Sequence, residues 1–429
     1  MNQTATRPTA TETHDPTELI GSLARAARLA QRKLAAMTSA QRAAALHLAA
    51  DRLEASAPAI LTANAEDIAA GEARGIAKAM LDRLALDEAR LAGIAAAVRA
   101  VADLPDPVGE VIDTAERPNG LHLQRIRVPI GTIGIIYESR PNVTADAAAL
   151  CVRAGNAALL RGGSEAVHSN RAIHAALAEG LAEGGVPAEA VQLLPTQDRA
   201  AVGAMLAASG LIDMIVPRGG KSLVARVQAD ARVPVLAHLD GICHTYVHAA
   251  ADPEMAQNIA LNAKLRRTGI CGAMETLLID ADFPESEKLV AALIDKGCEV
   301  RGDDRIRSLD RRVTPASAND WDTEYLDAVL SVAMVDDLEA ALAHIARHSS
   351  GHTDAIVTSD KDVAEQFLTQ VDSAIVMHNA SSQFADGGEF GLGAEIGIAT
   401  GRLHARGPVA LEGLTTYKWQ VRGAGQTRP

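Results

Sequence analysis

The chain has 429 residues and a formal charge of −13, with 48% hydrophobic and 22% charged residues. This length exceeds one ordinary core, and this balance is typical of folded proteins, so we expect two or three globular domains. Aromatic residues make up only 2% of the chain. Neither that scarcity nor the negative charge suits a surface that binds nucleic acid. No apolar run approaches the roughly 18 residues that cross a bilayer.

Residues 1–16 form a leader rich in Thr and Pro, which we expect to be disordered and which lacks the apolar stretch of a signal peptide. The chain has four cysteines, and none of them shows Cys-x-x-Cys or paired metal-ligand spacing. Free thiols in a reducing compartment are therefore expected, and the sequence predicts a cytoplasmic protein.

The sequence pattern of the first half of the chain changes twice. Residues 17–108 carry Ala and Leu at helical spacing, with Ser39 as the N-cap of the second predicted helix. Residues 109–131 predict a β-hairpin around the turn Arg117-Pro118-Asn119-Gly120, because Pro fixes φ and Gly tolerates a positive φ. From residue 132 to 238, strand-length apolar runs alternate with helices, and the last predicted strand covers 233–241. This alternation indicates a parallel, doubly wound sheet.

A second α/β unit covers residues 239–404 and ends in a long glycine-rich stretch, after which 405–423 lead into a final strand. A two-stranded arm is marginal alone, so we expect the hairpin to lean on another part of the protein, often another subunit. The sequence thus predicts one domain from 17–108 and 132–238, a second from 239–404, and an arm from 109–131 and 405–423.

Two predicted strand-to-helix turns contain paired glycines, at 160–165 and at 217–222. Paired glycines let a backbone approach a phosphate, and the following helix offers unpaired N–H groups. A tight turn explains the same residues, and neither segment is a G-x-G-x-x-G or Walker A motif. Both interpretations remain open at this point.

Cys271 differs from the other cysteines because it lies between glycines where a helix ends and a strand begins. The nearby guanidinium group of Arg267 would favour a thiolate, although a plain turn residue also fits. Cys151 lies in an Ala-rich helix and is interpreted as a core residue. Cys243 and His244 are adjacent on a predicted strand, so their side chains point to opposite faces and do not cooperate.

His238, His244 and His248 have the even spacing that places side chains on one face of a strand, and Asp240 shares their parity. A metal site needs a further ligand, and the chain shows no motif that completes the set. Structural or substrate-facing roles are favoured, and no metal site is predicted.

Three segments, 138–166, 262–280 and 384–419, contain ESRPNVTADAAALCVRAGN, RRTGICGAMETLLID and FADGGEFGLGAEIGIATGRLHARGP. In this order, they resemble the γ-glutamyl phosphate reductases of the aldehyde dehydrogenase superfamily, over residues 18–423. The resemblance implies a doubly wound nucleotide-binding domain, an α/β catalytic domain and a β-hairpin oligomerisation arm, in a homodimer or homotetramer.

The resemblance also implies roles for individual residues. Cys271 would attack the acyl group, and Asn142 would hold the oxyanion. The implied cofactor contacts are Arg161, Gly162, Ser164 and Glu165 at the adenosine ribose, Gly219, Gly220 and Ser222 at the pyrophosphate, and Glu324 at the nicotinamide ribose. The expected substrate contacts are Glu138, Arg140, Arg267 and Asn379, with Lys264 adding positive charge to the cleft.

The implied reaction is the NADPH-dependent reduction of L-glutamate 5-phosphate to L-glutamate 5-semialdehyde and phosphate, the second step of proline biosynthesis. Hydrolytic members of the superfamily begin a Glu-Leu-Gly-Gly stretch with a glutamate that activates water. Here the stretch is His238-Leu239-Asp240-Gly241. A thioester that is reduced by hydride does not need to react with water, so the absence of this glutamate favours the reductive reaction. A separate glutamate 5-kinase would supply the labile acyl phosphate, by transient contact.

Two other functions fit parts of the sequence. A non-phosphorylating aldehyde dehydrogenase would oxidise a small aldehyde without phosphate. A catalytically dead relative, acting as a scaffold, would have no activity for Cys271→Ser to remove.

Overall fold

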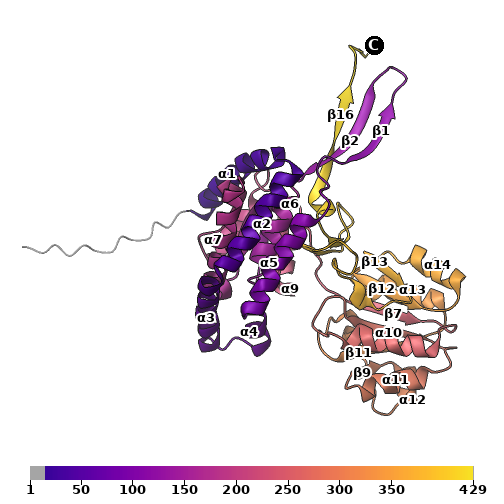
Figure 1. Cartoon of the computed structure of the whole chain (residues 1–429). Coiled ribbons are helices and arrows are strands. Elements are labelled where there is room, and N and C mark those ends of the chain that lie inside the picture. The colour runs from indigo at the N-terminus through magenta and orange to yellow at the C-terminus, as the bar shows by residue number, and fades with distance from the viewer. Residues whose placement is uncertain (1–14, 429) are drawn as a thin grey trace, which may run out of the picture.

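A computed structural model describes residues 15–428 of the chain. Figure 1 shows two lobes side by side and a slender arm that rises between them, with the C-terminus at the tip of the arm. The predicted leader, 1–16, lies outside the described residues except for Asp15 and Pro16, where the first helix begins. Within the described part, no helix is long and apolar enough to cross a membrane.

The predicted helical region is confirmed as five helices, which cover the first lobe (Figure 1). They are α1 (Pro16–Ala36), α2 (Ser39–Ala55), α3 (Ala57–Ala73), α4 (Lys78–Leu84) and α5 (Glu88–Asp103). The N-cap of α2 is Thr38 rather than the predicted Ser39. Its hydroxyl accepts from the backbone of Gln41, whose side chain accepts from the N–H of Thr38, so this reciprocal capping box shifts the boundary by one residue.

The predicted doubly wound sheet is confirmed in the first lobe. Its four parallel strands lie in the order β5-β4-β3-β6. The strands are β3 (Thr132–Tyr137), β4 (Ala157–Gly162), β5 (Val191–Leu193) and β6 (Met214–Arg218), and the helices between and after them are α6 (Val143–Arg153), α7 (Val167–Glu183), α8 (Arg199–Ala207) and α9 (Lys221–Asp230). β3 and β4 are buried along their whole length, as continuous apolar runs predict for a covered parallel sheet.

The prediction of a strand over 233–241 is wrong. Within this segment only Val235 forms a β-bridge, with Ile215 of β6. The N–H of Ile215 donates to the carbonyl oxygen of Pro234, and the N–H of Leu236 donates to the carbonyl oxygen of Ile215. Pro234 has no N–H to donate, so the ladder does not extend. The chain instead crosses to the second lobe as an irregular connection, and His238 and Gly241 lie on it.

The second lobe contains a seven-stranded parallel sheet in the order β10-β9-β11-β8-β7-β12-β13. Its strands are β7 (Cys243–Val247), β8 (Met274–Asp280), β9 (Glu299–Gly302), β10 (Thr314–Pro315), β11 (Val329–Val335), β12 (Thr353–Val357) and β13 (Ile375–His378). The helices are α10 (Pro253–Leu265), α11 (Ser286–Asp295), α12 (Asp304–Leu309), α13 (Leu338–His348) and α14 (Lys361–Gln370). The short β10 was not predicted, because so few residues show no clear alternation.

The arm is a three-stranded antiparallel sheet in the order β1-β2-β16 (Figure 1). β1 (Val111–Glu116) and β2 (His122–Pro129) form the predicted hairpin, and Gly120 in its turn has a φ of +82°. The chain's own last strand, β16 (Thr415–Arg422), completes it. Part of the segment predicted for the arm does not belong to it, because β15 (Gly407–Val409) pairs with β14 (Gly397–Ala399) instead.

Close packing of α2 against α7 yields a test of the first lobe. A Cβ added at Gly180 would lie 2.4 Å from Cα of Ala49 and 2.5 Å from its backbone nitrogen, and backbone cannot move aside. We expect Gly180→Ala to lower the free energy of unfolding by about 1–3 kcal/mol, measured by urea denaturation.

Gly203→Ala in α8 is the matched control, because nothing lies within 4 Å of its added methyl group. That change should stabilise the helix by about 0.5–1 kcal/mol. Equal effects of the two substitutions would contradict this packing.

Candidate active site

Cys271 lies half-buried in the turn between α10 and β8, where the backbone of two other segments packs against it. A Cβ at Gly241 would lie 2.1 Å from the carbonyl oxygen of Cys271. A Cβ at Gly272 would lie 3.1 Å from the carbonyl oxygen of Ser382. The turn therefore requires glycine at position 241, and its shape is set by contacts from outside its own sequence.

Two further groups hold this turn and the segment packed against it. The thiol of Cys243 donates to the carbonyl oxygen of Cys271 at 3.2 Å. The N–H of Gly241, on the packed segment, donates to Oε1 of Glu324 at 2.9 Å. Glu324, predicted to hold the nicotinamide ribose, thus lies near the Cys271 turn, and burial raises its pKa.

Two imidazole rings lie next to the Cys271 thiol. His238 and His352 pack edge to face with ring centroids 5.1 Å apart. Sγ of Cys271 and one ring nitrogen from each histidine lie within 4.8 Å of one another. Burial lowers the pKa of His238, and it lowers that of His352 to about 3, so both rings are neutral near pH 7.

The predicted grouping of His238 with His244 and His248 is wrong. The ring of His244 lies in the core, where its Nδ1 is 3.2 Å from Asp354, and that of His248 contacts Thr358. β7 begins only at Cys243 and its register shifts at the next residue, so even spacing does not carry back to His238. Cys243 and His244 have different partners, as predicted.

Burial controls the thiol of Cys271. The pKa of Cys271 is raised to about 11, mostly by burial, with smaller contributions from Glu395 and Glu324 and with Arg218 opposing them. The prediction that the neighbouring guanidinium of Arg267 favours the thiolate is wrong for this structure, since Arg267 is exposed and burial outweighs the charge that does act.

Arginine side chains of the first lobe place positive charge near Cys271. Burial lowers the pKa of Arg140, Arg218 and Arg83 lower it further, and the thiolate of Cys271 opposes them. These three guanidinium groups therefore lie close together near Cys271. Lys264, predicted to line the cleft, does not. Its ammonium group is fully buried 2.5 Å from Glu275, because this face of α10 packs on the sheet.

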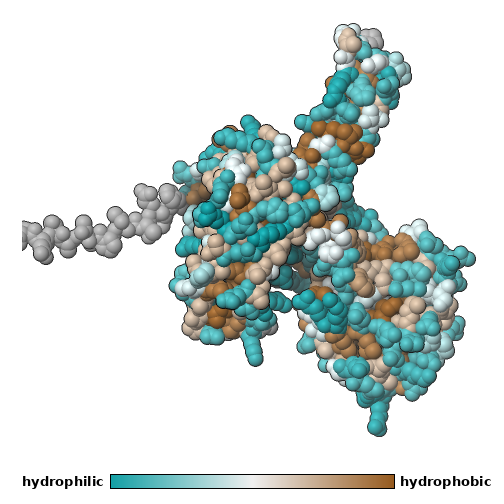
Figure 2. Space-filling model, in the orientation of Figure 1, coloured by the Kyte–Doolittle hydropathy of each residue, from teal (hydrophilic) through white to brown (hydrophobic). Residues whose placement is uncertain are grey.

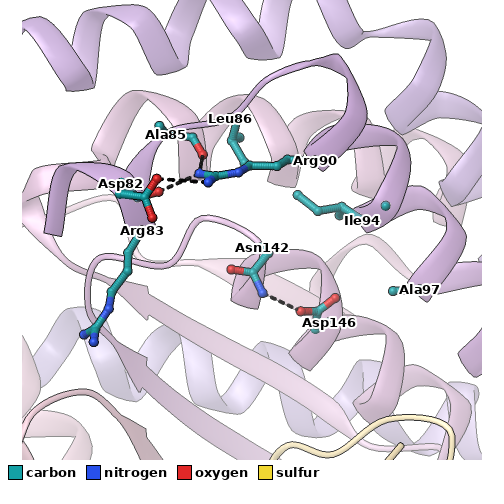
Figure 3. Close-up of a pocket in the computed structure, with 10 residues that line it drawn as sticks. Asp82, Arg83, Ala85, Leu86, Arg90, Ile94, Ala97, Asn142 and Asp146 are labelled. Carbon is teal, nitrogen blue, oxygen red and sulfur yellow. Dashed lines mark hydrogen bonds and ion pairs between the residues drawn. The ribbon is translucent and has the colours of Figure 1, made fainter. Parts of the chain in front are cut away.

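A cavity of about 400 Å³ opens between α4, α5 and the start of α6 (Figure 3). Asn142, the predicted oxyanion partner, lines it, and its Nδ2 donates to Oδ2 of Asp146 at 2.8 Å. Burial raises the pKa of Asp146 to about 6. Figure 3 shows the side chain of Arg83 apart from the ion pair between Asp82 and Arg90. Charges of both signs thus line one cavity.

The turn before α9 has the features of a phosphate cradle. A Cβ at Gly219 would lie 2.5 Å from Oε2 of Glu138, and the N–H of Gly220 donates to the same oxygen at 3.3 Å. A carboxylate thus occupies the place where a helix N-terminus attracts an anion. Ser222 lies in the first turn of α9. These residues fit the pyrophosphate of a dinucleotide.

The turn after β4 contains the residues predicted at the adenosine ribose. The guanidinium of Arg161 donates to the carbonyl oxygens of Gly162 and Gln197. Glu165 accepts from the hydroxyl of Ser139 at 3.0 Å and from its N–H. Ser139 has a φ of +48°, and Glu165 holds this left-handed turn. Ser164 begins the short helix η1 (Ser164–Ala166).

Asn379 was predicted to contact substrate, but its amide joins β12 to β13. Its Oδ1 accepts from the N–H of Thr358, and its Nδ2 donates to the carbonyl oxygen of the same residue, both at 2.9 Å. The sequence interpretation missed Arg83, Asp146, Arg218 and His352 as site residues. Arg218 carried a signal, as a charged residue at the end of a strand and before a Gly-Gly turn. Asp146 lies within the segment 138–166 that carries the family resemblance, whereas Arg83 and His352 come from segments with no motif.

A sequence model of the aldehyde dehydrogenase family matches residues 2–320 of the chain. An acetylating aldehyde dehydrogenase from Geobacillus thermoglucosidasius has the same fold, with a TM-score of 0.69 at 17% identity, over 96% of this chain and 98% of that chain. The chain belongs to the aldehyde dehydrogenase family, whose members use nicotinamide cofactors.

More similar proteins lie within one branch of that family. A γ-glutamyl phosphate reductase of Novosphingobium aromaticivorans is 75% identical over 99% of this chain and 100% of its own length. One from Zymomonas mobilis is 64% identical, over 96% of this chain and 97% of its own. The crystal structure of γ-glutamyl phosphate reductase from Thermotoga maritima has a TM-score of 0.93 at 40% identity, covering 96% of this chain and 100% of that one. The chain belongs with the γ-glutamyl phosphate reductases.

The raised pKa of Cys271 leads to a prediction that can be tested in the protein without substrate or cofactor. Below its pKa of about 11, the thiolate fraction grows with pH. We expect the rate of Cys271 alkylation by iodoacetamide to rise about tenfold per pH unit from pH 7 to pH 9, followed by mass spectrometry.

Glu395→Gln removes a negative charge near the thiol, so alkylation should be faster at every pH in this range. Glu389→Gln, an exposed change in the same loop, is the control and should have no effect. A wild-type profile that levels off below about pH 8 would show that the thiol is already activated.

Proposed function

We propose that this protein reduces L-glutamate 5-phosphate to L-glutamate 5-semialdehyde and phosphate, the second step of proline biosynthesis, through a thioester on Cys271. The arrangement that carries the proposal is a half-buried thiol in a braced turn, flanked by two neutral imidazoles and by arginines from the other lobe. The names of the similar proteins support the choice of substrate.

His238 accepts the proton that Cys271 loses. Its Nδ1 donates to the carbonyl oxygen of Ile398 at 2.8 Å, so the ring presents Nε2 as an acceptor. The sulfur forms a bond to the acyl carbon, and the bond from that carbon to the phosphate oxygen breaks. Arg140 and Arg218 attract the phosphate and stabilise its charge as it leaves. The role of Asn142 at the oxyanion stays a prediction.

A bound nicotinamide cofactor supplies the hydride that reduces the thioester. The residues that would hold it are Gly219, Gly220 and Ser222 at the pyrophosphate, where the carboxylate of Glu138 now accepts from the N–H of Gly220. We favour NADPH over NADH because Arg161 has two further arginines near it at the ribose end. Burial lowers the pKa of Arg161, Glu165 and Glu138 oppose this change, and Arg199 and Arg226 add to it.

The cavity beside α6 takes the amino-acid end of the substrate. Asp146 and Oδ1 of Asn142 accept from the α-ammonium group, and Arg83 donates to the α-carboxylate. Arg83 also lies near the nucleophile turn, since a Cβ at Gly269 would be 3.8 Å from its guanidinium. This assignment uses each charge in the cavity that is not already paired with another, as Asp82 and Arg90 are.

The same proposal extends to partners and compartment. A separate glutamate 5-kinase supplies the acyl phosphate in the cytoplasm. The arm associates copies of the chain into a homodimer or homotetramer, because β16 exposes Tyr417, Trp419 and Val421. Figure 2 shows apolar surface on the arm, as association surfaces often have.

The covalent step is tested in the reverse direction, by following the reduction of NADP⁺ or NAD⁺ with glutamate 5-semialdehyde and phosphate. We expect turnover to require phosphate or arsenate and to favour NADP⁺. Cys271→Ser should lose at least about 10³-fold in turnover.

Cys298→Ser, in a buried cysteine of the second lobe, is the matched control and should keep activity. Equal turnover without phosphate would point to a non-phosphorylating aldehyde dehydrogenase. Unchanged turnover in Cys271→Ser would rule out the thioester, and an inactive wild type would favour the scaffold.

The amino-acid subsite is tested with 5-oxopentanoate, which lacks the α-ammonium group. Asp146→Asn should raise KM for glutamate 5-semialdehyde about 10–100-fold, with little change for 5-oxopentanoate. Arg83→Ala should raise both KM values, and Arg74→Ala, on an exposed arginine of the same lobe, should raise neither.

The dependence of KM on pH should differ between the same two substrates. Because Asp146 has a pKa raised to about 6, it loses its charge as pH falls below that value. The KM for glutamate 5-semialdehyde should then rise below about pH 6, while that for 5-oxopentanoate should stay flat. Parallel profiles would place the ammonium group elsewhere.

A further inference from the structure

Three potential metal ligands meet at the nucleophile. Sγ of Cys271 and one ring nitrogen each from His238 and His352 lie within 4.8 Å of one another. They come from three separate segments: the connection between the lobes, the turn before β8, and the residue that precedes β12. Sequence spacing could not bring them together, and for that reason no metal site was predicted.

Each histidine holds one ring nitrogen in place and leaves the other open. Nδ1 of His238 is bound to the carbonyl oxygen of Ile398, and Nδ1 of His352 lies 2.8 Å from Oγ1 of Thr353. Nε2 of the fully buried His352 has no hydrogen-bond partner among the described residues. A buried ring nitrogen without a partner is unfavourable, and an oxygen that orients the opposite nitrogen is typical of metal-binding histidines.

The composition of the cluster selects the metal. One thiolate and two imidazoles suit Zn²⁺, whereas Mg²⁺ and Ca²⁺ prefer oxygen ligands. A tetrahedral zinc site holds such atoms roughly 3.5 Å apart, so no pair of ligands, all within 4.8 Å, has to close by more than about 1.3 Å. The half-buried thiol of Cys271 can make most of this movement by rotating about its own χ1.

We propose that Zn²⁺ binds reversibly between Cys271, His238 and His352, with water in the fourth position, and that it blocks the nucleophile. The thiol loses its proton to solvent as the zinc–sulfur bond forms, and no oxidation or reduction takes place. Zinc withdraws electron density from the bound thiolate and covers the side on which it binds, so attack on an acyl group becomes slower. The site would thus make the protein sensitive to free zinc.

The binding test uses the metal-free full chain and Co²⁺ as a spectroscopic probe. We expect a thiolate-to-cobalt charge-transfer band that one equivalent of Zn²⁺ abolishes. His352→Gln and His238→Gln should each weaken binding at least about tenfold, and Cys271→Ser should remove the band. Cys298→Ser and His168→Gln are controls that keep the ligand set and should bind as wild type.

A second measurement needs no variant and so does not depend on the folding of one. One equivalent of Zn²⁺ should slow iodoacetamide alkylation of Cys271 in the wild type at least about tenfold, and EDTA should restore it. Absence of the band, equal affinity in Cys271→Ser, or unprotected alkylation would each overturn the proposal. None of these readouts requires enzyme activity, so they stand apart from the proposed reaction.

Discussion

The contact between the backbone of Gly241 and the carbonyl of Cys271 is the constraint on which the site depends. No side chain fits at position 241, since its Cβ would lie 2.1 Å from that oxygen. Each of the two segments has a further partner: the thiol of Cys243 donates to the carbonyl oxygen of Cys271, and Glu324 accepts from the N–H of Gly241. Cys271 is therefore positioned by the connection between the lobes, and its geometry is coupled to how those lobes pack.

Burial sets the electrostatics around that turn more than any single charge does. It raises the pKa of Cys271 to about 11 and keeps His238 and His352 neutral, although Arg140 and Arg218 lie nearby. A neutral thiol beside a neutral imidazole can ionise by proton transfer between them as the sulfur attacks, so no charged thiolate has to be maintained in the free protein. The same pairing of sulfur with open ring nitrogens makes the site attractive to zinc.

The first lobe supplies the groups that can bind anions. Ser139, in a left-handed turn held by Glu165, separates Glu138 from Arg140. The carboxylate of Glu138 reaches the N-terminus of α9, whereas the guanidinium of Arg140 acts on Cys271. One short turn after β3 thus reaches both the proposed cofactor site and Cys271, as expected at the carboxyl ends of parallel strands.

The sequence by itself determined the alternation of strands and helices, the hairpin with its Pro-Asn-Gly turn and the Gly-Gly turns, and it singled out Cys271 as the candidate nucleophile, because each of these features is encoded within a few neighbouring residues. Burial and long-range proximity are not encoded locally. Only the tertiary structure placed His352 beside Cys271, buried Lys264 against Glu275, and removed His244 from the histidine group. It also reversed the expected activation of the thiol, since desolvation depends on every segment that covers a group, including distant ones.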